Sequence, residues 1–207
     1  MIIGPGAANL MVAGAGIVHS ERSDAVSRLE RSELFGIQSW LALPSRDEEM
    51  EPAFLPYSEA VLPTWAESGV RGRLVMGHWG GLTSPVDFPA ETLYLDLVMD
   101  PGASVVIPKD LEERAVYSLG ADIFIDGIRY PKETLLILTP NQEVRITAEQ
   151  SSRVVVLGGE PLDGPRHLWW NFVSSRRDRI EHAKDEWQQG RFASVPGETE
   201  WIPLPEA

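Results

Sequence analysis

Residues 12–22 read Val12-Ala13-Gly14-Ala15-Gly16-Ile17-Val18-His19-Ser20-Glu21-Arg22, a glycine-rich apolar run that ends in a histidine and a carboxylate. Side chains two apart on a strand point to the same face. We therefore predict that His19 and Glu21 lie together on a strand and are candidate metal ligands. Imidazole and carboxylate without sulfur suit iron(II) or manganese rather than copper(I) or structural zinc. Two protein ligands alone hold a first-row ion weakly.

Downstream of residue 70 the sequence predicts a dense series of short strands separated by turns such as Asp100-Pro101-Gly102-Ala103 and Asp126-Gly127. No helical crossover lies between them, which disfavours a parallel α/β sheet. The pattern indicates a complete antiparallel barrel or sandwich. The predicted strands are 73–77, 92–98, 104–107, 115–119, 122–125, 133–138, 144–148 and 153–157.

The sequence before and after this predicted barrel contains a strand, a linker, a helix and a tail. Residues 34–43 read as one long strand that stops at Pro44, and residues 45–52 are rich in charge and proline. A helix is predicted late, capped by Ser174 or Ser175 with Asp178 completing a capping box, and ended by Gly190. The predicted domains are 1–44 (a partial first barrel), 45–70 (linker), 71–172 (second barrel), 173–190 (helix) and 191–207 (extended tail).

Three stretches resemble one known family. The 12–22 motif resembles the second metal-binding motif of the cupins, and more narrowly that of the pirins. Residues 157–162 and 169–175 are similar to the closing strand of pirins and the entry to their last helix, in the same order and separation. The resemblance implies an all-β, pirin-like double cupin barrel with the first barrel incomplete, plus one C-terminal helix.

The same resemblance implies Fe(II) or another divalent metal in the first barrel, held by three histidines and one glutamate. His19 and Glu21 match the last histidine and the glutamate. The other two come from an upstream His-x-His segment that has no counterpart in this sequence, which places the start of the chain after that segment. Cupin spacing counted from Gly102 puts a second histidine pair near Pro108 and Asp110, so the second barrel is expected to be metal-free.

Composition excludes several function classes. A formal net charge of -13 repels phosphate backbones, so direct nucleic-acid binding is not expected. There is no cysteine, which removes disulfides and thiolate chemistry and fits a reducing cytoplasm. The glycines and proline of the uncharged first eighteen residues break any signal or membrane helix, so no membrane role is expected. His78, His167 and His182 carry no functional prediction.

Two functions stay open. The first is a quercetin 2,3-dioxygenase-like enzyme acting on a flavonol-like substrate, with Glu21 as ligand and catalytic base and Gln38 in the pocket. This chain by itself is expected to be inactive. The second is a non-catalytic regulatory protein that binds a transcription factor or a metabolic enzyme. An opened barrel leaves sheet edges unpaired, so we expect residues 8–43 either to form a homodimer or to pack on the second barrel.

Overall fold

The computed structural model describes residues 3–22 and 35–206 and divides the chain into two compact units. Unit 1 comprises residues 1–10 and 54–161, and unit 2 comprises residues 11–53 and 162–207. Each unit is therefore assembled from stretches that are far apart in the sequence. Across the described ranges, no helix has the length and apolar character needed to cross a membrane.

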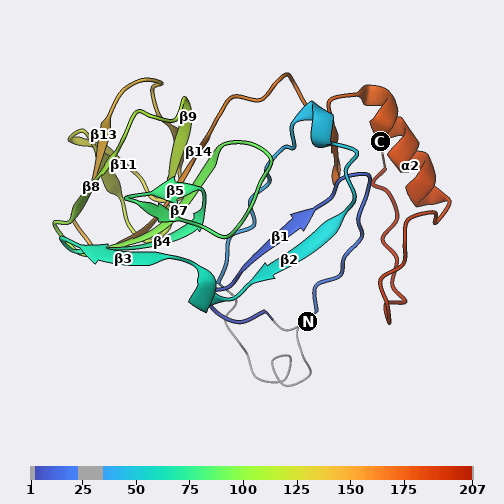
Figure 1. Cartoon of the computed structure of the whole chain (residues 1–207), viewed down its shortest axis with the longest axis horizontal. Helices are drawn as coiled ribbons and strands as arrows, with labels where there is room; N and C mark the ends of the chain where they lie inside the picture. The colour runs from blue at the N-terminus through green and yellow to red at the C-terminus, as the bar shows by residue number, and fades with distance from the viewer. Residues whose placement is uncertain (1–2, 23–34, 207) are drawn as a thin grey trace. The chain divides into compact units, whose positions relative to one another are not determined.

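Unit 1 consists mainly of two antiparallel sheets (Figure 1). The six-stranded sheet has the order β12-β9-β14-β7-β4-β3 and the four-stranded sheet the order β11-β10-β13-β8. The first contains β3 (Thr64–Glu67), β4 (Val70–Met76), β7 (Thr92–Met99), β9 (Glu113–Ser118), β12 (Leu135–Ile137) and β14 (Ser152–Gly159). The second contains β8 (Ser104–Ile107), β10 (Ile123–Ile125), β11 (Ile128–Tyr130) and β13 (Val144–Ala148).

The core of unit 1 follows from the two-residue period of its strands. Along β7, alternate residues from Leu93 to Met99 are buried, whereas three consecutive residues of β14, from Val154 to Val156, are buried. Ile107 and Ile146 of the four-stranded sheet belong to the same buried cluster. The apolar faces of the two sheets thus bury each other. This confirms the predicted all-β class, and each of the eight strands predicted after residue 70 overlaps an observed strand.

The remaining elements of unit 1 are short. Between β4 and β7 lies a hairpin of β5 (His78–Trp79) and β6 (Leu82–Thr83), and before β3 lies the 3-10 turn η2 (Glu59–Val61). A two-stranded sheet pairs β1 (Ala8–Val12) with β2 (Ala53–Tyr57), and most residues of both strands belong to unit 1. Both β2 and β3 fall within the range 45–70 that the sequence predicted as a linker. Proline and charge mark the turns in this range, but the strands between them pair with distant partners.

One buried cation organises an end of the unit 1 barrel. Arg114 of β9 is 3% exposed, and its guanidinium donates to the carbonyls of Pro108 (2.6 Å), Thr139 (2.7 Å) and Gln142 (2.8 Å). Its Nε is also buried and has no hydrogen-bond partner among the described residues. A buried charge is costly unless it is fully hydrogen-bonded. Arg114 therefore fixes three loop backbones at once.

We expect Arg114→Met to lower the free energy of unfolding by about 2–4 kcal/mol, because three carbonyls lose a charged donor. Urea denaturation followed by circular dichroism measures the change. Arg145→Met is the control, since Arg145 is exposed on β13 and its side chain donates to the Ser104 hydroxyl at 3.3 Å. Equal losses in the two variants would contradict the role given to Arg114.

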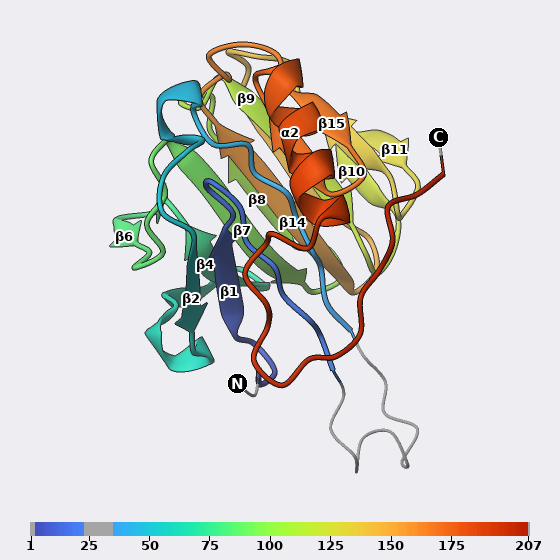
Figure 2. The same ribbon diagram turned by 90° about the vertical axis from the view of Figure 1, so that its right-hand side faces the viewer.

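Unit 2 has little regular structure. It contains the 3-10 turn η1 (Ser45–Asp47), a hairpin of β15 (His167–Trp169) and β16 (Phe172–Ser174), and the helix α2 (Arg177–Gln188). Figure 2 shows α2 running alongside β15, and Ile180 and Ala183 are its buried residues. Trp187 stacks on Trp201 of the tail with ring centroids 6.3 Å apart.

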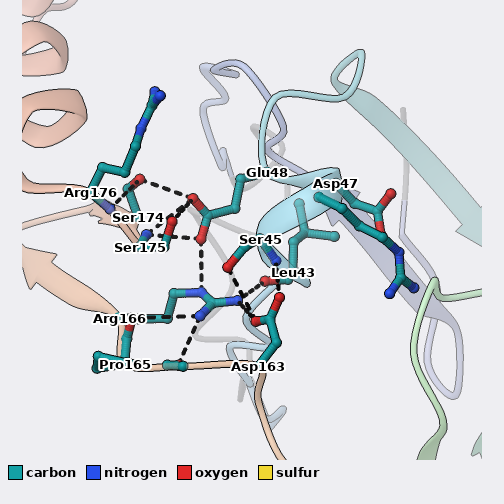
Figure 3. Close-up of polar contacts among 12 residues, drawn as sticks. Leu43, Ser45, Asp47, Glu48, Asp163, Pro165, Arg166, Ser174, Ser175 and Arg176 are labelled. Carbon is teal, nitrogen blue, oxygen red and sulfur yellow. Dashed lines mark hydrogen bonds and ion pairs between the residues drawn. The ribbon is translucent and has the colours of Figure 1, made fainter.

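A buried carboxylate joins the two stretches of unit 2 (Figure 3). Glu48 accepts hydrogen bonds from the Ser174 hydroxyl (3.0 Å) and from the backbone N–H (2.8 Å) and hydroxyl (2.9 Å) of Ser175. It also pairs with the Arg166 Nε at 2.8 Å, and the two side chains are only 13% and 7% exposed. Arg166 in turn donates to Asp163 (2.6 Å) and to the Leu43 carbonyl (2.7 Å).

The predicted N-cap of the helix, Ser174 or Ser175, is wrong, and the hydrogen bonds to Glu48 explain why. The N-cap residue of α2 is Arg176, which makes no side-chain cap hydrogen bond, and both serine hydroxyls donate to Glu48 instead. A carboxylate placed before a helix N-terminus also interacts favourably with the helix dipole. Glu48, from a distant stretch, therefore engages both serine hydroxyls, and the Ser174 hydroxyl accepts only the Arg176 N–H, at 3.2 Å, just before the helix.

The predicted strand 34–43 is also not observed, and Leu34 lies outside the described residues. Residues 35–43 carry no strand assignment. A strand is stabilised by its ladder of backbone hydrogen bonds with a neighbour. No described segment supplies such a ladder along 35–43, although the apolar pattern is that of a strand.

We expect Glu48→Gln to destabilise unit 2 by about 2–4 kcal/mol, because the buried Arg166 loses its carboxylate partner. Amide hydrogen exchange in α2 measures the change. Glu49→Gln is the matched control, since Glu49 is 51% exposed where it pairs with Arg176 and Arg179. Exposed pairs contribute little, so a comparable increase of exchange in both variants would contradict the prediction.

Candidate metal centre

The glycines before His19 are explained by tight backbone packing within unit 2. Beyond β1 the chain turns, with the Gly16 N–H donating to the Ala13 carbonyl (2.8 Å) and the Ala15 N–H to the Met50 carbonyl (2.9 Å). Gly14 has φ 48°, and a Cβ there would stand 2.1 Å from the Met50 oxygen. No side chain fits that position. The turn delivers the chain to His19 in a defined place.

The structure brings His19 and Glu21 together. The His19 Nε2 lies 3.9 Å from the Glu21 Oε1, and the side chains are 44% and 79% exposed. The predicted strand is not formed, because residues 17–22 carry no strand assignment. The two side chains share a direction, but the pair faces water rather than the interior of a barrel.

The donor set of this pair does not fit a bound metal ion as it stands. Within residues 3–22 and 35–206, no group of three or more His, Cys, Asp or Glu side chains could hold an ion. A first-row metal site in a protein takes three or four such ligands. Gln38, the predicted pocket residue, is exposed, and no described contact joins it to His19. The pair supplies the chemistry of two ligands and no more.

The segment carrying the pair is held by the C-terminal tail, a feature that the sequence did not reveal. Arg22 donates to Glu198 through Nε (2.9 Å) and Nη2 (2.6 Å), and to Glu200 through Nη2 (2.9 Å). The Glu198 carboxylate also accepts the backbone N–H groups of Thr199 (2.9 Å) and Glu200 (3.1 Å). The only available signal was a cation beside the motif and two acids in the tail. We call this contact the tail clasp.

The electrostatic effect of the tail clasp is seen in the pKa of the Glu198 carboxyl group. The backbone N–H of Glu200, the Arg22 guanidinium, the backbone N–H of Thr199 and the Ser20 side chain lower the pKa of Glu198 to about 2. Each of these donors favours the charged carboxylate. The clasp is therefore a contact of ionised groups throughout the physiological pH range.

The other histidines take ordinary roles in the described structure. The His78 Nδ1 lies 3.0 Å from the Thr83 hydroxyl, and the His182 Nε2 lies 3.3 Å from the Glu186 carboxylate one helical turn away. At Pro108 and Asp110, where cupin spacing would place a second metal pair, the Arg114 guanidinium bonds the Pro108 carbonyl. A fixed cation disfavours a second one beside it, and the metal-free second barrel stays a prediction.

Comparisons with known proteins agree with the resemblance seen in the sequence. The Pirin C-terminal cupin domain matches residues 94–193. A Pirin-like protein of Caulobacter vibrioides is 38% identical over 208 residues, which is 99% of this chain and 71% of that protein. The chain belongs to the pirin family. The predicted fold, a cupin of the pirin type with one C-terminal helix, is thereby confirmed.

Two further relatives of this pirin carry an enzyme name. A Pseudomonas aeruginosa protein provisionally named a quercetin 2,3-dioxygenase is 29% identical over 91% of this chain and 59% of its own length. A crystal structure of quercetin 2,3-dioxygenase from Acinetobacter baumannii is 28% identical with a TM-score of 0.74, covering 81% of this chain and 57% of that one. The chain thus spans less than two thirds of both.

We expect tail docking to weaken as pH falls from about 4.5 towards 2. The pKa of Glu198 is depressed in the folded state, so its contribution is present above the ordinary pKa and is lost as the folded group protonates. The Trp187 indole N–H, which donates to the Ile202 carbonyl at 2.8 Å, reports docking in NMR spectra recorded against pH.

The matched variants for this titration are Glu198→Gln and Glu206→Gln, both in the tail. Glu198→Gln should shift the Trp187 indole signal towards the undocked position already at neutral pH. Glu206→Gln should titrate like the unmodified protein. An unchanged acid transition in Glu198→Gln would show that the clasp does not hold the tail.

Proposed function

We propose that this pirin is part of a metal-dependent enzyme of the quercetin 2,3-dioxygenase kind, in which His19 and Glu21 are two of the metal ligands. The observation that carries the proposal is the 3.9 Å approach of an imidazole and a carboxylate directly after the glycine turn. Support comes from the relatives named for this activity, at 28% and 29% identity.

The proposal assigns roles to this chain's own residues. A bound divalent ion, Fe(II) or a similar metal, would supply Lewis-acid and oxygen chemistry. His19 would hold its imidazole towards the ion, and the exposed Glu21 carboxylate would take the proton of a flavonol hydroxyl. Gln38 is proposed to line the substrate side. Two donors are too few, so the remaining ligands must come from residues outside the described set.

Flavonol consumption tests the proposal, followed by loss of flavonol absorbance in air. We expect turnover by the protein purified from its own cells and loaded with Fe(II), and a loss of at least about 100-fold in His19→Ala and Glu21→Gln. His182→Ala is the control, because His182 forms the other exposed histidine–carboxylate pair on the described surface. The 207-residue chain alone should be inactive and bind Mn(II) or Fe(II) only weakly.

Two results would overturn the enzyme proposal. One is no flavonol turnover by the metal-loaded protein, and the other is full turnover in His19→Ala. Either would favour the second candidate function, a regulatory protein that binds a transcription factor or a metabolic enzyme. That alternative draws on the incomplete donor set and on exposed apolar side chains in the tail such as Trp201 and Ile202. It requires no ligand role for His19.

A further inference from the structure

A series of aromatic rings connects the β15–β16 hairpin, the helix α2 and the C-terminal tail. Phe192, at the start of the tail, stacks on Phe172 of β16 with ring centroids 6.1 Å apart. The Phe192 ring also meets the Trp187 ring of α2 edge-on, at 5.5 Å. Trp187 in turn stacks on Trp201 at 6.3 Å. We call these four rings the ring stack, and it ends in the tail.

The glycine turn before His19 packs against the same ring stack. A Cβ placed on Gly16 would stand 3.0 Å from the Phe192 Cε1, so the backbone of the turn lies directly against that ring. After Glu21, the tail clasp binds the Arg22 guanidinium. The tail therefore contacts the segment that carries the candidate metal ligands on both sides of the pair.

The tail is held at the surface of unit 2. None of residues 191–206 is buried, and the Trp201 and Ile202 side chains are 56% and 66% exposed. In the tail clasp, the side chains of Arg22 and Glu200 are 45% and 73% exposed. Figure 2 draws the tail as an extended coil that follows α2. A segment with few buried apolar contacts opens locally at a small cost in free energy, so the tail can leave while α2 keeps its own buried residues.

The backbone between the tail clasp and the ring stack couples the two contacts. Glu198 and Trp201 are only three residues apart in the sequence. The Glu198 carboxylate accepts the backbone N–H groups of Thr199 (2.9 Å) and Glu200 (3.1 Å), which orders the chain between them. A short, ordered connection leaves little slack. Loss of one contact therefore weakens the other.

We propose that residues 192–202 form a releasable strap that positions the His19 and Glu21 pair, and that its two contacts, the ring stack and the tail clasp, open together. The closed strap fixes the backbone on both sides of the pair. The open strap leaves residues 17–22 without either contact. Trp201 and Glu198 are thus positioning residues. The strap itself requires no metal, and only its effect on turnover rests on the proposed function.

Limited digestion with trypsin tests the opening of the strap, because trypsin must take the arginine side chain into its own specificity pocket. Residues 1–21 contain no lysine or arginine, so cleavage after Arg22 releases a unique fragment for mass spectrometry. The initial rate follows the open population when the strap opens and closes quickly. We expect Trp201→Ala to raise this rate about fivefold, the effect of losing one aromatic pair, although no contact in the described structure joins Trp201 to Arg22.

Ile202→Ala is the matched control. The Ile202 side chain is 66% exposed, and the substitution keeps the backbone carbonyl that accepts the Trp187 indole N–H. It should leave the cleavage rate after Arg22 within about twofold of the unmodified protein. The helical circular dichroism signal checks that α2 is folded in each variant.

Nuclear magnetic resonance tests the positioning of the pair without any metal. We expect the heteronuclear NOE of the Glu21 backbone amide to fall in Trp201→Ala, because the open strap no longer fixes residues 17–22. In Ile202→Ala it should keep the value of the unmodified protein.

Turnover is a separate measurement, since it rests on the proposed function. In the metal-loaded protein, Trp201→Ala should lower the rate of flavonol consumption several-fold, because the pair is less well positioned. An inactive unmodified protein would remove the enzyme proposal and leave the digestion and NMR results as they stand.

Three outcomes would overturn the strap proposal. An unchanged cleavage rate after Arg22 in Trp201→Ala would show that the ring stack and the tail clasp open independently. Equal increases in Trp201→Ala and Ile202→Ala would show that the ring contact has no special role. Faster cleavage with an unchanged Glu21 amide would show that the strap opens but does not position the pair.

Discussion

The buried ion pair between Glu48 and Arg166 is the interaction between distant stretches of sequence on which unit 2 depends. Its two stretches, residues 11–53 and 162–207, contribute only a short hairpin, one helix and little other regular structure. A backbone ladder cannot hold such an assembly. The buried pair of Glu48 and Arg166 joins the two stretches, and the more exposed pairs of Glu49 with Arg179 and of Arg22 with Glu198 also cross between them. The Glu48–Arg166 pair is buried, so either partner left alone would be an uncompensated buried charge. This pair therefore favours one arrangement of the two stretches.

These contacts also explain how the candidate metal ligands His19 and Glu21 can be held in place without a strand. The glycine turn fixes the chain before His19, and the tail clasp fixes it after Glu21. Between the two anchors the imidazole and carboxylate converge to 3.9 Å. Positioning of the pair and completion of a ligand set are thus separate properties. The described residues provide the first and not the second.

Sequence was a reliable guide where the determining contacts are local. The strands 104–107 and 144–148 were predicted with the observed bounds, because a two-residue apolar period between turn residues is itself the signal. Prediction failed where the partner is distant. Ser174 and Ser175 have the chemistry of helix caps, yet Glu48 takes both hydroxyls from 126 or more positions away. Residues 35–43 have the pattern of a strand, but a pattern cannot supply the neighbour that makes one. The tail clasp could not be predicted from sequence periodicity either.

The two units differ in what their described residues provide. The barrel of unit 1 is filled by interlocking aliphatic side chains, and the Arg114 cation occupies the end where a second ligand pair would fall. Unit 2 carries the His19 and Glu21 pair.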